Sequence, residues 1–306
     1  MLAAISTPAG PRSVAVVEGV PDPAPGPHEA VIATEAFSLN RGELALLAAR
    51  PAGWRPGQDV AGTVVRAAAD GTGPQLGTRV VGLVEQAGWA ERVAVPIDRL
   101  AVLPDGVESA AAATLGIAGR TALRTTALGG SLLGRTVLVT GAAGGLGRFQ
   151  IQLAALAGAS VTAVSRRSGT EAALHALGAT TVISTADAAD GLFDLVLEGV
   201  GGSSLARSIR AVSPGGTIVL IGASDPDPAP IRLTDFFGHE AAMIRTYFSY
   251  ADTSSVADDL ALLVRLLAEG RLRADRGIQA DWSELNTVLD SFAAGRIDGK
   301  AVITIS

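Results

Sequence analysis

The 306-residue chain contains no cysteine, and this absence removes several kinds of chemistry at once. Without thiols there is no disulfide, no thiolate metal ligand and no cysteine nucleophile. The three histidines, His28, His175 and His239, are far apart in the sequence, so the spacing of a zinc site is missing. Lysine is nearly absent as well, because Lys300 is the only one and arginine supplies the other basic side chains. A zinc site built from histidine and aspartate stays possible in principle, but no spacing in the sequence supports it.

Long apolar runs are also missing. No uninterrupted stretch approaches the roughly 18 residues that a membrane span needs, and the first residues, MLAAISTPAGPRS, lack the basic start and apolar middle of a signal peptide. The net charge is −6, from 24 basic and 30 acidic side chains, which weighs against a nucleic-acid partner. Hydrophobic residues make up 48% of the chain and the mean hydropathy is +0.37, enough for sizeable cores. These properties predict a soluble cytoplasmic protein, and the length favours two domains.

The first hundred or so residues are predicted to be rich in β-strands. Short valine-rich runs alternate with turn-forming segments such as PDPAPGP and DGTGPQLG. Short strands at this spacing are typical of a small barrel or sandwich. The runs span residues 13–20, 29–39, 59–68, 78–84 and 89–96.

After about residue 120, predicted strands alternate with predicted helices. This alternation indicates βαβ units in a parallel sheet, and six strands is the number in a doubly wound dinucleotide-binding sheet. Past residue 252 come two amphipathic helices and a final strand, KAVITIS. The six strands are predicted at residues 136–140, 160–165, 180–184, 192–200, 216–222 and 241–248.

The segment VLVTGAAGGLGRFQ, residues 137–150, joins the first of these strands to a helix through a cluster of glycines. Glycines at such a turn let the chain reverse, let backbone N–H groups approach a pyrophosphate, and let the helix pack close to the strand. The N-terminus of the helix adds a partial positive charge. The segment therefore predicts a phosphate-binding turn for a dinucleotide.

Two spacings of the fingerprint fit this segment. As G-x-G-x-x-G, its positions are Ala142, Gly144 and Gly147, with alanine in place of the first glycine. The short-chain dehydrogenase version, T-G-x-x-x-G-x-G, also matches, starting at Thr140.

The short-chain interpretation fails further along the chain. That family needs a Tyr-x-x-x-Lys pair to move protons. The two tyrosines here are Tyr247 and Tyr250, and Lys300 lies far downstream of both.

Other short stretches occur in a fixed order along the chain: FSLNRGEL (37–44), RPGQDVAGTVV (55–65), GTRVVGLV (77–84), GWAERVAVP (88–96), LPDGVESAAAA (103–113), AGRTAL (118–123), LEGVGG (197–202), SPGGTIVLIG (213–222), LLAEGRL (266–272) and GKAVITI (299–305). With the glycine segment, they resemble the medium-chain dehydrogenase/reductase superfamily in its zinc-independent, quinone-oxidoreductase-like branch. The resemblance runs from about residue 10 to the C-terminus, and alanine at the first glycine position is common in this branch.

The resemblance implies an α/β protein of two domains. A GroES-like β-barrel catalytic domain would comprise residues 1–118 and 252–306. A six-stranded doubly wound, or Rossmann, nucleotide-binding domain would comprise residues 119–251. The active site would lie in the cleft between the two, and the protein would form a homodimer through the nucleotide-binding domain.

The resemblance also indicates which metal site is missing. Zinc-bearing members place a cysteine ligand at the position of Asn40, and a Gly-His-Glu segment at the positions of Gly57, Gln58 and Asp59. With glutamine in the histidine position and no cysteine, neither that site nor the four-cysteine structural site of those members can form. Without a Lewis acid to activate an alcohol, we expect hydride donation to a quinone or another α,β-unsaturated carbonyl.

The end of the second strand of the nucleotide-binding domain predicts the cofactor. NAD-specific proteins have an acidic residue here that bonds the ribose 2′-hydroxyl, but eighteen residues past Gly147 this chain has Ser165, Arg166 and Arg167. A hydroxyl and guanidinium groups bind a 2′-phosphate that a carboxylate would repel. The segment therefore predicts NADPH, the alternative being arginines that simply face solvent.

Further site residues follow from the resemblance. Asn40 matches the position beside nicotinamide and substrate, where an amide can hydrogen-bond the acceptor's carbonyl as negative charge develops; the alternative is a turn-forming asparagine. Thr121 is the usual cofactor neighbour, or an ordinary helix cap. The other candidate cofactor contacts are Ala142, Gly144, Gly145, Leu146, Gly147, Gly199, Val200, Gly201, Ile221, Gly222, Ala223, Phe248, Arg296 and Lys300.

The substrate pocket is predicted less sharply. Leu44, Trp54 and Trp89 are candidates for an apolar lining or for barrel core, and Phe248 is a candidate nicotinamide-pocket wall or a core residue. No proton donor is evident, because the tyrosine that enoyl-thioester reductases of the superfamily use has no counterpart. Two alternatives to a quinone or enone reductase stay open: a pathway-specific enoyl reductase or cyclising enzyme of secondary metabolism, and a non-catalytic NADPH-binding protein.

Overall fold

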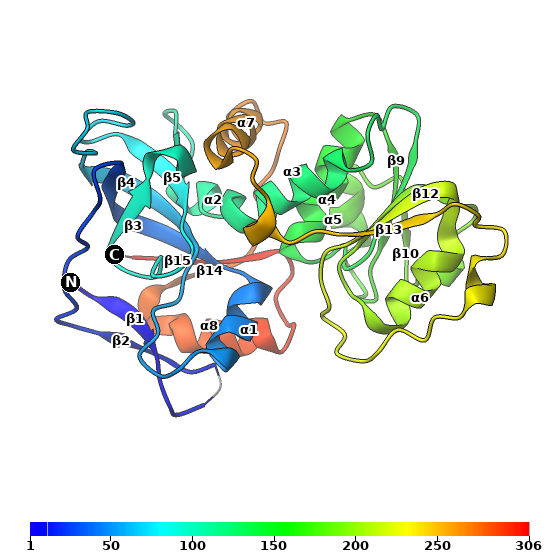
Figure 1. Ribbon diagram of the computed structural model, residues 1–306, viewed down its shortest axis with the longest axis horizontal. Coiled ribbons are helices and arrows are strands. Elements are labelled where there is room, and N and C mark those ends of the chain that lie inside the picture. Colours follow the sequence, from blue (N-terminus) through cyan, green and yellow to red (C-terminus); the bar gives the residue numbers. More distant parts are fainter. Residues whose placement is uncertain (11, 306) are drawn as a thin grey trace. The chain divides into compact units, whose positions relative to one another are not determined.

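The computed structural model of the protein describes residues 1–10 and 12–305, and the chain divides into two compact units (Figure 1). Unit 1 consists of Met1–Arg120 and Ser254–Ser306, and unit 2 of Thr121–Thr253. Among the described residues, no helix combines the length and the apolar character needed to cross a membrane.

Unit 1 is built on a seven-stranded sheet in the order β14-β15-β3-β4-β5-β7, with β6 also paired to β3. All these pairs are antiparallel except β14 with β15. The strands are β3 (Glu29–Leu39), β4 (Asp59–Arg66), β5 (Arg79–Leu83), β6 (Arg92–Pro96), β7 (Leu100–Val102), β14 (Arg276–Asp281) and β15 (Lys300–Thr304). A separate pair joins β1 (Ala3–Ser6) and β2 (Val14–Val17).

Two hydrophobic clusters form the core of unit 1. One contains the inward-facing valines and alanines of β3 to β6. The other joins the aromatic rings of Phe37, Trp89 and Trp282 to helices of the unit. The helices of unit 1 are α1 (Arg41–Ala49), α2 (Ser109–Ala112), α7 (Val256–Ala268) and α8 (Leu285–Ala293), of which α1 and α8 contribute side chains to this cluster. A π-helical turn, η2, covers Leu115–Gly119.

Unit 2 has a six-stranded, fully parallel sheet in the order β10-β9-β8-β11-β12-β13. The order reverses between β8 and β11, which is the crevice position for ligands in doubly wound sheets. The strands are β8 (Thr136–Val139), β9 (Ser160–Val164), β10 (Thr181–Ile183), β11 (Phe193–Glu198), β12 (Val212–Leu220) and β13 (Met243–Thr246). The connecting helices are α4 (Gly145–Leu156), α5 (Glu171–Ala176) and α6 (Gly202–Ala211), and α3 (Arg120–Ala127) precedes the sheet.

The parallel sheet of unit 2 and the mainly antiparallel sheet of unit 1 confirm the predicted α/β fold class. The six strands expected after residue 120 are all present, each within a few residues of its predicted bounds. Apolar side chains on both faces of the parallel sheet are buried by the helices, as continuous valine and leucine runs require.

Candidate functional site

The glycine loop of unit 2 joins β8 to α4, and at Gly147 it leaves no room for a side chain. Gly141 has a φ of +62°, which glycine adopts without strain. A Cβ on Gly147 would stand 2.7 Å from the Cα of Ala142 and from the carbonyl oxygen of Gly141. The first turn of α4 therefore packs directly on the loop backbone. Ala142 is fully buried, and its N–H donates to the carbonyl of Val164. These features fit a loop that lets a pyrophosphate approach backbone N–H groups.

The loops after β11 and β12 meet the glycine loop at the carboxyl edge of the sheet. The N–H of Gly199 donates to the hydroxyl of Thr140 at 2.9 Å. A Cβ on Gly222 would stand 2.9 Å from the carbonyl oxygen of Gly199, and one on Gly141 would touch Val200 at 3.4 Å. The fold thus brings together three of the chain segments that were predicted to bind the cofactor.

Glu198, which was not predicted from the sequence, fixes the loop after β11 at this edge of the sheet. Glu198 ends β11 and is fully buried, with no basic partner among the described residues. One carboxylate oxygen accepts from the N–H groups of Val200 and Gly201, and the other accepts from the hydroxyls of Ser204 and Ser208. Because four donors converge on it, this carboxylate fixes the loop after β11. An acidic residue ending an apolar run, as in LVLEGVGG, is the signal that could have found it.

The turn after β9 carries the predicted 2′-phosphate contacts. The hydroxyl of Ser165 lies 2.9 Å from that of Thr170 and accepts from the N–H of Arg167, which closes a compact turn. Arg166 is exposed and has no hydrogen-bond or ion-pair partner among the described residues. The bond from Ala142 to Val164 ties this strand end to the glycine loop.

In unit 1, Asn40 lies at the end of β3, directly before α1. Its backbone N–H donates to the carboxylate of Glu43, the third residue of the helix, at 2.7 Å. Its side chain is 6% exposed and bonds to residues on two other strands. The amide nitrogen Nδ2 donates to Asp59 at 2.8 Å, and the amide oxygen Oδ1 accepts from Lys300 at 2.6 Å.

Asp59 is the centre of this buried cluster. It has no exposed surface. Its Oδ2 accepts from the hydroxyl of Ser38 and from Asn40, and the ammonium of Lys300 lies 3.6 Å away. Its Oδ1 accepts from the N–H of Ile117 in the π-helical turn, at 2.7 Å. A Cβ on Gly116 would collide with this carboxylate, so glycine is required where the turn passes it. The carboxylate therefore links β3, β4, β15 and the turn.

Burial shifts the pKa values of Glu43 and Lys300, the two other ionisable groups beside Asn40. Removal from water raises the pKa of Glu43 to about 8, and the nearby negative charge of Asp59 adds to this effect. Burial lowers the pKa of Lys300 below its usual value, against the opposing attraction of Asp59 and Glu43. Lys300 was predicted near the cofactor, and the structure places it beneath Asn40, where it also donates to the carbonyl of Leu39.

The residues predicted to line the substrate pocket differ in their exposure. Leu44, Trp54 and Trp89 all belong to, or pack against, the aromatic core cluster of unit 1, and Trp89 is only 1% exposed. Phe248 is 53% exposed and its ring lies 5.5 Å from that of Tyr250.

Thr121 and Arg296 make contacts within or beside their own helices. Thr121 is buried in α3, where its carbonyl accepts from the hydroxyl of Thr125. Arg296 is exposed and bonds the hydroxyl of Ser291.

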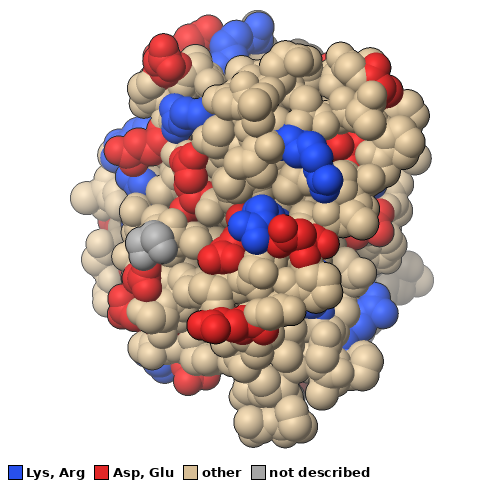
Figure 2. Space-filling view, turned by 90° about the vertical axis from the view of Figure 1, so that its left-hand side faces the viewer, with Lys and Arg blue, Asp and Glu red and all other residues tan. Residues whose placement is uncertain are grey.

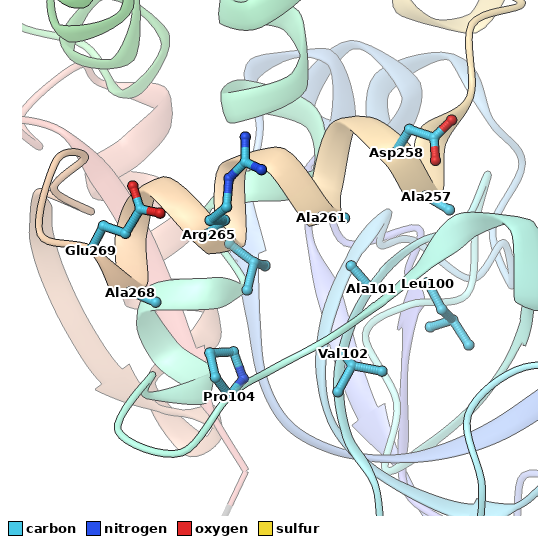
Figure 3. A pocket seen from close by; sticks show the side chains of 11 residues that line it. Leu100, Ala101, Val102, Pro104, Ala257, Asp258, Ala261, Arg265, Ala268 and Glu269 are labelled. Carbon is cyan, nitrogen blue, oxygen red and sulfur yellow. The ribbon is translucent and has the colours of Figure 1, made fainter.

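A cavity of about 640 Å³ lies in unit 1 between α7 and the segment that begins with β7 (Figure 3). Small side chains of α7, such as Ala261 and Ala268, line it together with Val102 and Pro104. None of the candidate site residues lines it. Within the described part of the chain, no group of three or more acidic, histidine or cysteine side chains is arranged to hold a metal ion.

Comparisons with known proteins bear on the family and on the fold. The profile of a family described as "Zinc-binding dehydrogenase" matches residues 145–266. A 2-methylene-furan-3-one reductase of Solanum lycopersicum is 29% identical over 81% of this chain and 63% of its own length. The solved quinone oxidoreductase of Coxiella burnetii has the same fold, with a TM-score of 0.86, 24% identity, and coverage of 100% of this chain and 99% of that one.

In sequence and in fold the chain is similar to the medium-chain dehydrogenase/reductase superfamily. The predicted resemblance to its quinone-oxidoreductase-like branch agrees with these relatives, among which are reductases and quinone oxidoreductases. Another relative, the spectinabilin polyketide synthase protein NorB of Streptomyces orinoci, is 30% identical over 91% of this chain but only 13% of its own length. The chain spans between 13% and 64% of the first curated relatives that it matches.

Proposed function

We propose that this protein transfers hydride from NADPH to a quinone or another α,β-unsaturated carbonyl, without zinc. The observation that carries the proposal is the place of the Lys300 ammonium, which lies 2.6 Å from Asn40 and 3.6 Å from Asp59. These two positions correspond, by family resemblance, to residues of the zinc site in metal-bearing members. Because a cation of the chain itself already neutralises Asp59, the donor set does not suit a metal ion.

The chain's own groups would bind and polarise the acceptor. When bound, NADPH supplies the hydride. The Asn40 amide donates a hydrogen bond to the acceptor's carbonyl oxygen, which stabilises the negative charge that develops there. Water protonates the reduced product. An acceptor that is already conjugated needs no Lewis acid for this reaction.

The choice of NADPH rests on the turn after β9. Arg166 is exposed and has no partner among the described residues, so its guanidinium is available for a 2′-phosphate. No carboxylate follows β9 to favour the 2′-hydroxyl of NADH.

Oxidation of NADPH, followed by absorbance, tests the reaction across quinones, simple enones and enoyl thioesters, with the metal content of the purified protein measured in parallel. We expect turnover of quinones or enones by protein that holds no stoichiometric zinc and is unaffected by a chelator. Binding of NADPH with no oxidation by any acceptor would instead support a non-catalytic nucleotide-binding protein.

The variant Arg166→Ala tests the cofactor assignment. Loss of a charged hydrogen bond costs roughly 1.5–3 kcal/mol, so KM for NADPH should rise about ten- to a hundred-fold. KM for NADH should stay within about twofold, because NADH has no 2′-phosphate. Arg271→Ala removes a comparable exposed charge from unit 1 and should leave both constants unchanged. Equal use of the two cofactors by the unchanged protein would refute the NADPH assignment.

A pathway-specific enoyl reductase of secondary metabolism is the second candidate. It is favoured by the similarity to the polyketide synthase protein NorB, which extends over 91% of this chain. Turnover of enoyl thioesters with no activity on quinones would select this alternative.

The proposed homodimer rests on strand β13. This edge strand is exposed at every residue, including the apolar side chains of Met243 and Ile244. An exposed apolar edge is a template for pairing with another strand, and a second copy of β13 across a two-fold axis would provide one. Exposed apolar side chains of the neighbouring segments would widen the contact: Ile231, Leu233, Phe237, Phe248 and Tyr250.

A further inference from the structure

We propose that Lys300 and Asp59 are positioning residues that fix the Asn40 amide as a hydrogen-bond donor toward the substrate. The inference rests on the proposed function, in which Asn40 contacts the acceptor's carbonyl. It adds two residues to that function, neither of which needs to touch the substrate.

Strand pairing brings Lys300 to Asn40. Strand β15 runs antiparallel to β3 with Ala301 opposite Leu39. The same register places Lys300, the first residue of β15, opposite Asn40, the residue that follows β3. The ammonium then has three oxygen neighbours, namely the carbonyl of Leu39 at 3.0 Å, the amide oxygen of Asn40 at 2.6 Å and the carboxylate of Asp59 at 3.6 Å. These three oxygens match the three donors of an ammonium group.

Charge fixes which way the Asn40 amide faces. Its oxygen faces the ammonium of Lys300 and its nitrogen faces the carboxylate of Asp59. Rotation of the amide by half a turn would set the NH₂ group against the ammonium and the oxygen against the carboxylate. Both contacts would then be repulsive in a site where Lys300 and Asp59 are almost completely buried. The orientation therefore follows from the network and needs no other support.

The oriented Asn40 amide has one N–H hydrogen that can bond a substrate. Nδ2 carries two hydrogens, and Asp59 accepts one of them. The other has no partner among the described residues, while Oδ1 already accepts from the ammonium. Asn40 can thus offer an N–H to a carbonyl oxygen. The ammonium draws electron density toward Oδ1, which strengthens that N–H as a donor.

The composition of the chain makes a direct test practical. Asn40 and Asn286 are the only asparagines, so labelling asparagine side-chain amides with ¹⁵N yields two NH₂ signals. Asn286 bonds the backbone N–H and carbonyl of Val14, has no bond to Lys300 or Asp59, and serves as an internal reference. In Lys300→Met, the Asn40 signals should shift or broaden while those of Asn286 stay in place. Unchanged Asn40 signals would overturn the positioning role whatever the activity.

Kinetics of the same variant test whether the fixed orientation matters for turnover. Loss of one charged hydrogen bond should lower kcat about ten- to a hundred-fold, with KM for NADPH within about twofold of the unchanged protein. Lys300→Gln keeps a neutral donor for Asn40 and should recover part of the loss. Arg271→Met removes an exposed charge elsewhere and should change neither readout. Shifted Asn40 signals with unchanged kcat would overturn the donor role.

A second variant keeps the test decisive if Lys300→Met does not fold. Removal of the ammonium alone leaves Asp59 buried and unpaired, whereas Lys300→Met with Asp59→Asn removes both charges together. Its expected shifts and kcat loss are the same, and the new amide at position 59 adds a third NH₂ group that the single variant Asp59→Asn assigns. Should the unchanged protein reduce no acceptor, the proposed function fails, and the ¹⁵N comparison alone still decides whether Lys300 holds Asn40.

Discussion

At the scale of single residues, the buried carboxyl of Glu43 makes stability depend on pH. Its pKa is raised to about 8 in the folded protein, from an ordinary value of 4.5. Between these values the folded state holds one more proton than the unfolded state, so stability falls as pH rises. The contribution is fully present below pH 4.5 and is lost as the pH passes through about 8. We expect the melting temperature to decline across this window by an amount equivalent to a few kcal/mol.

The variant Glu43→Gln isolates this effect. Glutamine does not titrate, so the decline of the melting temperature with pH should become shallower. Overall stability should also drop by roughly 1–3 kcal/mol, because one of the two N–H groups that the carboxylate accepts from loses its acceptor. The test therefore compares the slope of melting temperature against pH between the variant and the unchanged protein. An equally steep decline in the variant would assign the pH dependence to other groups.

At the scale of elements, the glycine loop and α4 act as one packed unit. The Cβ of Gly147→Ala would stand 2.7 Å from two backbone atoms that cannot move without shifting the loop. We expect this variant to lose NADPH binding by at least tenfold and to unfold at lower temperature. Calorimetric titration with NADPH and thermal unfolding measure the two effects.

Gly42→Ala is the matched control for that prediction. Gly42 also lies in the first turn of a helix, α1, but an added Cβ there meets nothing within 4 Å. Alanine should leave NADPH binding unchanged and stabilise the helix by up to about 1 kcal/mol. Equal losses in both variants would mean that crowding at Gly147 is not the cause, because alanine favours the helix at both positions.

The sequence predicted elements with strong patterns and missed those set by tertiary contacts. The six parallel strands are apolar runs between turn signals, so composition alone locates them. Helix α1 was not predicted, because Arg41 and Gly42 give it a weak start and Glu43 is buried inside the protein. Its N-terminus is instead stabilised by the carboxylate of Glu43.

The same distinction between local sequence patterns and tertiary contacts applies to the candidate site. The glycine loop is local in sequence, so spacing identifies it. The cluster of Asn40, Asp59 and Lys300 joins residues up to 260 positions apart, and the register of β15 on β3 brings them together. Sequence reasoning therefore named Asn40 and Lys300 separately, by resemblance, and could not show that they touch.

At the scale of the whole molecule, β13 predicts the oligomeric state. Ile244→Lys places a charge on the exposed edge strand, where it would face another copy. We expect the unchanged protein to behave as a dimer in sedimentation and the variant as a monomer at the same concentration. Val102→Lys introduces the same charge at an exposed apolar position of unit 1 and should remain dimeric. A monomeric unchanged protein would contradict the proposed dimer.

The single buried lysine has a consequence for how the protein responds to alkali. Because Lys300 is the only lysine and is 3% exposed, the basic side chains on the face drawn in Figure 2 are arginines. Guanidinium groups keep their charge above pH 12. The ammonium under Asn40 has a lowered pKa, so it gives up its proton in milder alkali than an exposed lysine would. Apart from the terminal amine, alkaline loss of positive charge begins inside the protein.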